Sequence, residues 1–232
     1  MVIPAAGIGS RMGSNRPKQY LLLRGKPILQ HTLERLNLPQ LAGFVVCLAD
    51  QDPYWQTVSF PRPVLRVSGG KERCHSVFNG LQALQSLAQS DDWVLVHDAA
   101  RPCVRPSDIE KLMSQLLEHP VGGLLAVPVR DTLKRASLGE NQTVLETVSR
   151  EGLWHALTPQ MFRLDMLSKA LEEILKRDIL VTDEAQAMEI MGYHPVLVEG
   201  HVDNIKITHP QDLELAELYL QQQEQIIESK NL

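Results

Sequence analysis

The sequence predicts an α/β fold with a mostly parallel sheet and crossover helices. Strand-like and helix-like segments alternate along its 232 residues, as they do where parallel strands are joined by helices. The run from Phe44 to Ala49 is apolar throughout, as expected of a strand that is buried on both faces of a sheet. A hydrophobic content of 44% is enough for such a core. No repeat or linker divides the chain, so we expect one domain over residues 1–232.

The expected elements follow from the local spacing of apolar residues. Strands are predicted at Val2–Ala6, Phe44–Ala49, Val64–Val67, Trp93–His97, Gly122–Val129, Val196–Glu199 and Ile205–Thr208. Helices are predicted at Ile28–Leu36, Val77–Leu87, Ile109–Leu117, Leu164–Ile174, Asp183–Ile190 and Gln211–Ile227. The stretch from Gln51 to Arg62 is expected to be a loop or a broken helix.

Residues 130–150 interrupt the alternation. Two segments with a period of two, Thr132–Arg135 and Val144–Val148, flank a turn at Leu138–Asn141, which indicates a β-hairpin. A polar hairpin is marginally stable in water unless it packs on something. We therefore expect this segment, a hairpin arm inserted in the domain, to project and pack against a second copy of the chain.

Composition excludes several classes of protein. A net charge of −5 argues against a general nucleic-acid binder, so an anionic substrate must be held by locally placed cations. No apolar run approaches 18 residues, so no membrane span is expected. The three cysteines are far apart without a Cys-x-x-Cys pair, which argues against a zinc site or a disulfide framework. A reducing, cytoplasmic setting fits this pattern.

The first loop carries the strongest functional signal. After the short apolar run that ends at Ala5-Ala6, Gly7, Gly9 and Gly13 are interleaved with small residues. Glycines permit tight turns, and successive N–H groups in such a loop form a concave anion site. The cations Arg11, Arg16 and Lys18 lie in or just after this loop, so it is predicted to bind a polyphosphate.

Two common phosphate motifs do not fit this loop. A P-loop closes with Gly-Lys-Ser/Thr, whereas Lys18 stands between Pro17 and Gln19. The dinucleotide fingerprint needs a third glycine where Met12 stands, and an acidic residue about twenty positions further on. What remains, Ala-Ala-Gly-x-Gly-x-Arg-Met followed by Pro-Lys-Gln, is similar to the signature loop of sugar-nucleotide pyrophosphorylases and cytidylyltransferases. The alternative is an ordinary glycine-rich turn with solvated basic residues.

Two further strand ends carry candidate residues, because ligands of open parallel sheets bind beyond the carboxyl ends of the strands. Gly69-Gly70 precedes a helix in which Ser76 could bond a base, although a plain strand-to-helix turn is an alternative. Asp98, at the next strand end, could hold Mg²⁺, or could be an ordinary turn aspartate. Arg101 beside it could equally form a surface ion pair.

Five pieces of the chain, in order, resemble the family of 2-C-methyl-D-erythritol 4-phosphate cytidylyltransferases. These pieces are Pro4 to Met12 with Pro17-Lys18-Gln19; Gly69-Gly70 with Arg73 and Ser76; His97 to Pro102; Pro128 to Thr132 running to Leu153–Gln160; and Thr182–Ala185 with Asp203–Lys206. The resemblance covers essentially the whole chain. It implies a doubly wound, Rossmann-like domain of the nucleotide-diphospho-sugar transferase type and a homodimer joined through the hairpin arms.

The resemblance also implies roles for individual residues. The groups with catalytic roles would be Arg11 and Lys18, which stabilise the pentacoordinate α-phosphate, together with Arg150 and Lys206. The groups that bind CTP would be Ala5, Ala6, Gly70 and Ser76 at the cytosine, and Gly7, Gly9 and Asp98 at the ribose, phosphates or magnesium. The groups that bind methylerythritol phosphate would be Arg101, Thr132, Asp203 and Lys206, with Arg150 and Thr158 reaching it from the partner subunit.

The implied reaction is attack of a substrate phosphate oxygen on the α-phosphorus of CTP, with pyrophosphate leaving. Two anions must meet in line, so catalysis consists mainly of positioning and charge neutralisation. No general base is needed, because a phosphate monoester is largely ionised at neutral pH. Two alternatives stay open: a cytidylyltransferase for another polyol phosphate such as ribitol 5-phosphate, and a non-catalytic nucleotide-binding module. The presence of both Arg11 and Lys18 argues against the latter.

Overall fold

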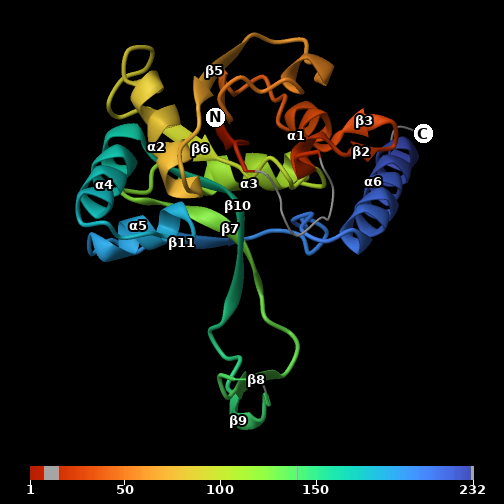
Figure 1. Ribbon diagram of the computed structural model, residues 1–232, viewed down its shortest axis with the longest axis vertical. Coiled ribbons are helices and arrows are strands. Elements are labelled where there is room, and N and C mark those ends of the chain that lie inside the picture. The colour runs from red at the N-terminus through yellow and green to blue at the C-terminus, as the bar shows by residue number, and fades with distance from the viewer. Residues whose placement is uncertain (8–15, 140, 231–232) are drawn as a thin grey trace.

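A seven-stranded sheet forms the centre of the molecule (Figure 1). The computed structural model describes residues 1–7, 16–139 and 141–230. The strands lie in the order β11-β7-β10-β6-β1-β4-β5. Their bounds are β1 Val2–Pro4, β4 Phe44–Leu48, β5 Val64–Ser68, β6 Trp93–Val96, β7 Gly122–Pro128, β10 Trp154–Arg163 and β11 Val196–Glu199.

The pairing is parallel except at β10. Strand β1 pairs in parallel with β4 and β6, β4 with β5, and β7 with β11, whereas β10 is antiparallel to both β6 and β7. This arrangement confirms the predicted α/β fold with a mostly parallel sheet.

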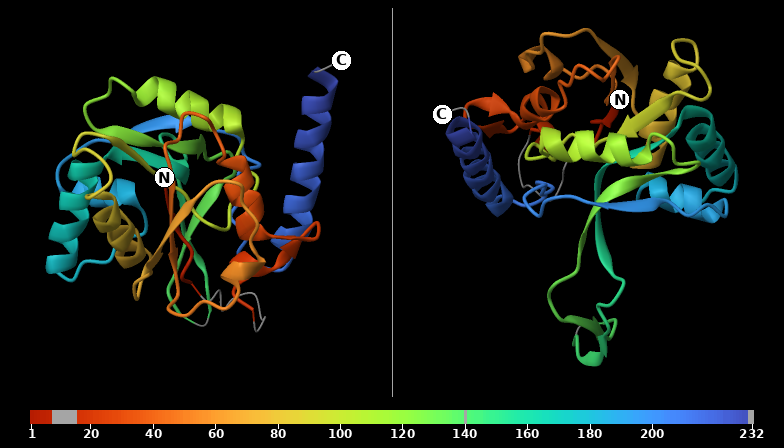
Figure 2. Two further views of the ribbon diagram at one scale, coloured as in Figure 1. Left: turned by 90° about the horizontal axis from the view of Figure 1, so that it is seen from above. Right: turned by 180° about the vertical axis from the view of Figure 1, so that it is seen from behind.

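Helices cover both faces of the sheet (Figure 2). The helical elements are η2 Lys18–Tyr20, α1 Ile28–Arg35, η3 Trp55–Thr57, α2 Arg73–Leu84, α3 Pro106–Leu116, α4 Leu164–Lys176, α5 Glu184–Ile190 and α6 Gln211–Lys230. One buried cluster packs α1 and α3 on the sheet, and a second packs α2, α4 and α5 on the opposite face. Successive residues of one strand join different clusters, as Val45 and Val46 do, because strand side chains alternate between the faces.

A third, smaller cluster attaches α6 to the body. It contains Leu23 of the short strand pair β2 (Leu22–Leu23) and β3 (Lys26–Pro27), Ile207, and Leu220 of α6. The cluster lies beside the sheet and joins three segments that are distant in sequence. Within the part of the chain that the structure describes, no helix is long and apolar enough to cross a membrane.

One strand was missed, and one strand prediction was wrong. No strand was predicted at β10, yet it lies between β6 and β7 near the centre of the sheet. Residues 205–208 were predicted as a strand but are irregular, with the N–H of Ile207 donating to the carbonyl of Ala100. Their alternation of apolar and polar residues instead reflects packing of Ile205 and Ile207 against the cluster that holds α6.

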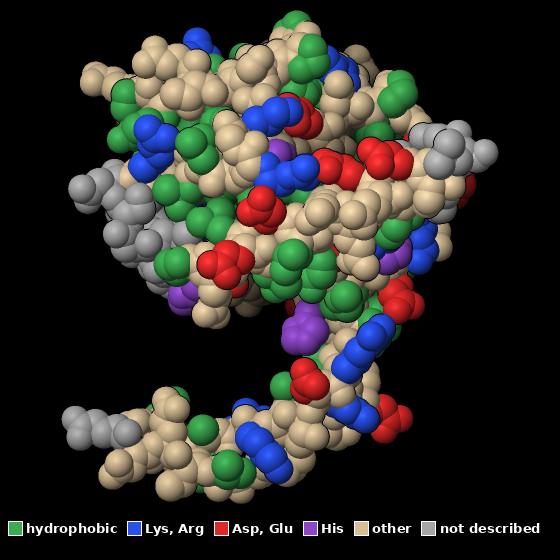
Figure 3. All heavy atoms as spheres, turned by 90° about the vertical axis from the view of Figure 1, so that its right-hand side faces the viewer, with side chains coloured by type: hydrophobic (Ala, Val, Ile, Leu, Met, Phe, Trp, Pro, Cys, Tyr) green, Lys and Arg blue, Asp and Glu red, His purple; other side chains and the backbone are tan. Residues whose placement is uncertain are grey.

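Residues 130–150 form an arm that stands away from the body (Figures 1 and 3). Its strands β8 (Leu133–Ala136) and β9 (Val144–Val148) pair in antiparallel fashion. The arm leaves the body at the end of β7 and returns into β10. Three large apolar side chains on it, Leu138, Val144 and Leu145, are exposed.

Candidate functional site

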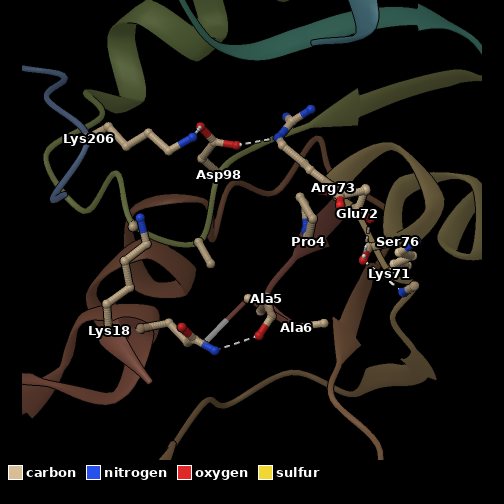
Figure 4. A pocket seen from close by; sticks show the side chains of 15 residues that line it. Pro4, Ala5, Ala6, Lys18, Lys71, Glu72, Arg73, Ser76, Asp98 and Lys206 are labelled. Atoms are coloured by element: carbon tan, nitrogen blue, oxygen red, sulfur yellow. Dashed lines mark hydrogen bonds and ion pairs between the residues drawn. The ribbon is translucent and has the colours of Figure 1, made fainter. Parts of the chain in front are cut away.

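A cavity of about 440 Å³ lies at the carboxyl ends of the parallel strands β1 and β6 (Figure 4). Its lining comes from five segments: Pro4 to Gly7, Lys18 and Gln19, Gly70 to Arg73 with Ser76, Asp98 to Ala100, and Lys206. It therefore lies where an open parallel sheet is expected to bind its ligand.

One wall of the cavity is backbone with almost no side-chain bulk. The amide of Gln19 donates from Nε2 to the carbonyl of Ala5 at 2.6 Å, which fixes the peptide that follows β1. The N–H of Gly70 donates to Oγ of Ser76 at 2.9 Å. A Cβ at Gly69 would collide with the side chain of Ala6, and one at Gly70 with His75. This wall therefore keeps its shape only with glycine at both positions.

The opposite wall is a cluster of charges around Asp98 (Figure 4). Oδ1 of Asp98 accepts from Nε of Arg73 at 2.9 Å, and Oδ2 pairs with Nζ of Lys206 at 2.8 Å and with Nε of Arg101 at 3.5 Å. Burial alone would raise the pKa of Asp98, but the charges of Arg73, Lys206 and Arg101 hold it well below its usual range. Asp98 is therefore an anion that gathers cations at the cavity.

Lys18 brings a further cation from the first wall (Figure 4). It lies in η2, and its Nζ donates to the carbonyl of Ile207 at 3.1 Å. Ile207 directly follows Lys206, so this bond ties Lys18 to the backbone beside Lys206. Both lysines are predicted to act on phosphate groups. The cavity can thus surround an anion with positive charge from both sides.

A buried network beneath Asp98 fixes the backbone of this strand end. Oγ1 of Thr158 accepts the N–H of Asp98 at 3.1 Å and lies 2.9 Å from Nδ1 of His97. Nε2 of His97 lies 3.1 Å from the carbonyl of Arg101, which can only accept, so we assign the proton to Nε2. Burial lowers the pKa of His97 to about 4. The imidazole is therefore a neutral structural bridge.

Most of the predicted site residues within the described chain meet at the cavity. Its lining includes Ala5, Ala6, Gly7, Lys18, Gly70, Ser76, Asp98 and Lys206. Arg101 adjoins it through Asp98 and also donates to the carbonyl of Asn204 at 2.7 Å. Gly9 and Arg11 lie outside the described residues.

Thr158 and Asp203 lie outside the cavity lining. Thr158 is buried under Asp98 of its own subunit. Asp203 is buried too, and its Oδ2 accepts from Arg105 at 2.6 Å and from Gln223 of α6 at 2.9 Å. The predicted roles of both residues toward the substrate stay predictions.

Thr132 and Arg150 lie on the arm, outside the cavity of their own subunit. Both are exposed, and Arg150 donates from Nη1 to the carbonyl of Arg130 where the two sides of the arm meet. Their roles toward substrate stay predictions.

Sequence reasoning gave no role to Arg73, one of the partners of Asp98. Arg73 lines the cavity, and its guanidinium binds both Asp98 and Glu184, which is 111 residues away in sequence. Both residues belong to motifs that carried the family resemblance, but no local pattern indicated that they pair. Gln19, whose amide donates to the carbonyl of Ala5, also belongs to one of these motifs, and the sequence indicated no role for it.

The donor set for a divalent cation is small. In the described ranges no group of three or more His, Cys, Asp or Glu side chains is placed to hold a metal ion. Mg²⁺ characteristically takes one or two carboxylates and completes its shell with phosphate oxygens and water. The cavity fits such an ion if the triphosphate brings most of its ligands and Asp98 supplies one oxygen. Asp98 as a magnesium ligand stays a prediction.

Comparisons with known proteins agree over most of the chain. The family model described as 2-C-methyl-D-erythritol 4-phosphate cytidylyltransferase matches residues 1–222. Proteins of that name from Aliivibrio fischeri and Pseudomonas putida are 52% and 56% identical, over 95% and 92% of this chain and 92% of each relative.

Solved structures are similar as well. The crystal structure of 2-C-methyl-D-erythritol 4-phosphate cytidylyltransferase from Francisella tularensis is 37% identical, with a TM-score of 0.81, over 94% of this chain and 97% of that one. The enzyme of that name from Thermus thermophilus is 32% identical, with a TM-score of 0.75, over 94% of this chain and 96% of that one.

Proposed function

The chain belongs to the 2-C-methyl-D-erythritol 4-phosphate cytidylyltransferase family, and from this membership we propose its function and the roles of its residues. The function is transfer of CMP from CTP to 2-C-methyl-D-erythritol 4-phosphate, with release of pyrophosphate, in isoprenoid biosynthesis. The observation that carries it is the family match across residues 1–222, which contain every residue of the cavity lining.

Nucleotide choice is proposed to depend on the backbone wall. Ala5, Ala6, Gly70 and Ser76 would contact cytosine, because glycine and small side chains let a base approach the backbone closely, and a tight backbone-lined pocket favours a pyrimidine over the larger purine. Gly7, Gly9 and Asp98 would lie at the ribose and phosphates.

Charge neutralisation is proposed to be the main source of catalysis. A phosphate oxygen of the substrate attacks the α-phosphorus while the bond to the pyrophosphate oxygen breaks, so negative charge builds up on the transferring group. Lys18 and Lys206 border the cavity from two sides and are placed to face that charge, together with Arg11. Mg²⁺, when bound, would neutralise phosphate charge and orient the triphosphate.

The binding site for the second substrate, 2-C-methyl-D-erythritol 4-phosphate, is proposed to be formed by both subunits of a homodimer. Arg101 and Lys206 would hold its phosphate from one subunit. Thr132 and Arg150 would come from the partner's arm, on which Leu138, Val144 and Leu145 are exposed and available for an interface. We also propose a cytoplasmic location, in keeping with three buried cysteines that carry free thiols.

The test is pyrophosphate release by purified protein with Mg²⁺, one of CTP, UTP, ATP or GTP, and one of several polyol phosphates. We expect turnover with CTP and 2-C-methyl-D-erythritol 4-phosphate and much slower turnover with the purine nucleotides. Faster turnover of ribitol 5-phosphate would contradict the assigned substrate. Nucleotide binding without release for any pair would contradict a transferase.

A further inference from the structure

Glu184 is a buried carboxylate that lies next to the cavity but does not line it. Its side chain is 1% exposed, and both of its oxygens accept from one guanidinium: Nη1 of Arg73 lies 2.6 Å from Oε1, and Nη2 lies 3.0 Å from Oε2. This two-point contact fixes the plane and direction of the Arg73 guanidinium.

Glu184 is itself held firmly. It is the first residue of α5, and the preceding Asp183 caps that helix by accepting the N–H of Gln186 at 2.9 Å. Gln160 of β10 accepts the N–H of Ala185 at 2.8 Å and donates to Asp183 at 3.0 Å. The carboxylate therefore has a position set by the sheet.

Arg73 passes this constraint to the cavity. With both terminal nitrogens on Glu184, only its Nε is directed at Asp98, at 2.9 Å from Oδ1. The other oxygen of Asp98 binds Lys206 at 2.8 Å and Arg101 at the longer distance of 3.5 Å. Negative and positive side chains therefore alternate in a row from Glu184 through Arg73 and Asp98 to Lys206. Of these four residues, Lys206 is the one on the loop after β11.

We propose that Glu184 is a positioning residue for the transfer reaction, acting through Arg73 and Asp98 to hold the Lys206 ammonium where it meets the substrate phosphate. The inference rests on the proposed function, in which Lys206 contacts that phosphate. Without Glu184, the terminal nitrogens of Arg73 are free to bind both oxygens of Asp98. Lys206 then loses its carboxylate partner and its fixed place.

A purely stabilising role explains the arrangement less well. Replacing a buried ion pair with apolar residues of similar volume is often neutral or stabilising. If Arg73 and Glu184 served stability alone, their two-point contact would not need to leave Nε of Arg73 for Asp98 at the cavity. The alternating chain of charges is what a positioning role requires.

The test compares Glu184→Gln with Glu189→Gln, the same substitution at an exposed residue of the same helix. Glu184→Gln is expected to lower kcat/KM for 2-C-methyl-D-erythritol 4-phosphate by about tenfold or more, and to change the Kd of CTP by less than about threefold. Glu189→Gln is expected to match the wild-type protein in both.

A double-mutant cycle with Lys206→Met separates positioning from general loss of structure. If Glu184 acts through Lys206, Glu184→Gln lowers kcat/KM by less than about twofold in the Lys206→Met background, because the group it positions is gone. Equal factors in both backgrounds, or no loss of kcat/KM in the single variant, would overturn the proposal.

Arg73→Lys provides a second variant if Glu184→Gln does not fold, as judged by circular dichroism. It keeps the positive charge but cannot make the two-point contact, so it should show the same coupling to Lys206→Met. Lack of coupling there would also overturn the proposal. Because the inference rests on the proposed function, a wild-type protein without transferase activity would overturn both, whereas an active wild-type protein with an uncoupled Glu184 would overturn the inference alone.

Discussion

Two cations assigned to the same substrate, Lys206 in the body and Arg150 on the arm, have opposite surroundings. Lys206 pairs with buried Asp98, which is fixed by Arg73 and by the network under β6. Arg150 is exposed and bonds to a backbone carbonyl on the other side of the arm. The body thus holds its charges in place through its own contacts. Among the residues that the structure describes, Arg150 forms no ion pair, in keeping with the proposal that it serves a site completed by the partner.

The ion pairs of the two regions differ in the same way. The side chains of Arg73 and Glu184 in the body are 22% and 1% exposed, whereas those of Arg135 and Glu146 on the arm are 61% and 56% exposed. Solvent screens the arm pair strongly, and its side chains lose entropy when they are held together. Substitutions in the body should therefore have large effects and those on the arm pair small ones.

The largest effect is expected from Lys18→Ala. If Lys18 faces charge that develops in the transition state, its loss should lower kcat on the order of 100-fold or more while changing the Kd of CTP much less. Steady-state kinetics and calorimetric titration with CTP measure the two quantities. Lys169→Ala, at a surface pair with Asp165, is the matched control. A Lys18→Ala protein with near-normal kcat would remove this lysine from the catalytic groups.

A smaller effect is expected from protonation of His97. Burial lowers its pKa to about 4, below the value of about 6.5 for an exposed histidine. Between these values the unfolded chain binds a proton that the folded chain does not, so stability falls as the pH is lowered through this range. From pH 7 to pH 5 we expect a loss of about 2 kcal/mol from this group.

Urea unfolding of the wild-type protein and of His97→Asn at both pH values measures this contribution. The variant should lose less stability on acidification, whereas His209→Asn, at an exposed histidine, should behave like the wild-type protein. The same pH dependence in His97→Asn and the wild-type protein would show that the buried imidazole does not contribute. No histidine lies within residues 130–150, so this effect belongs to the body.

The smallest effect is expected from Arg135→Ala on the arm. Exposed ion pairs contribute about 0–1 kcal/mol, so the free energy of unfolding should change by less than about 1 kcal/mol. Chemical denaturation measures it, with Glu146→Ala as the reciprocal variant. A larger loss in both variants would mean that this pair is buried in the assembled protein.

The position of the site was predictable because sheet topology determines it. Strand ends at Ala5, Gly69 and Asp98 meet at one edge once the strands run in parallel, and apolar runs indicate those strands without tertiary information. Local pattern therefore sufficed for the position of the cavity and for the residues at these strand ends, whereas the role of Lys206 was implied only by the family resemblance.

The features that could not be predicted from the sequence depend on contacts between distant segments. No strand was predicted at β10, which contains Pro159, a residue type that is rare in central strands, and its pairing with β7 has a register irregularity between Ala156 and Gln160. The pairing of Arg73 with Glu184 and the burial of Asp203 against Arg105 leave no local signal. Residues that support other residues are therefore harder to find from sequence than residues that line the cavity.

We propose that the body of one subunit and the arm of its partner together form each site. Subunits of Lys18→Ala and Arg150→Ala proteins, each weakly active alone, are mixed and allowed to exchange, and pyrophosphate release is measured. In a heterodimer with shared sites, one site carries both substitutions and the other carries neither, so about a quarter of the wild-type activity should return after full exchange. If Arg150 acts within its own subunit, every site keeps one substitution and the mixture stays as inactive as its parents. That result, or a monomer by sedimentation at the assay concentration, would contradict the account.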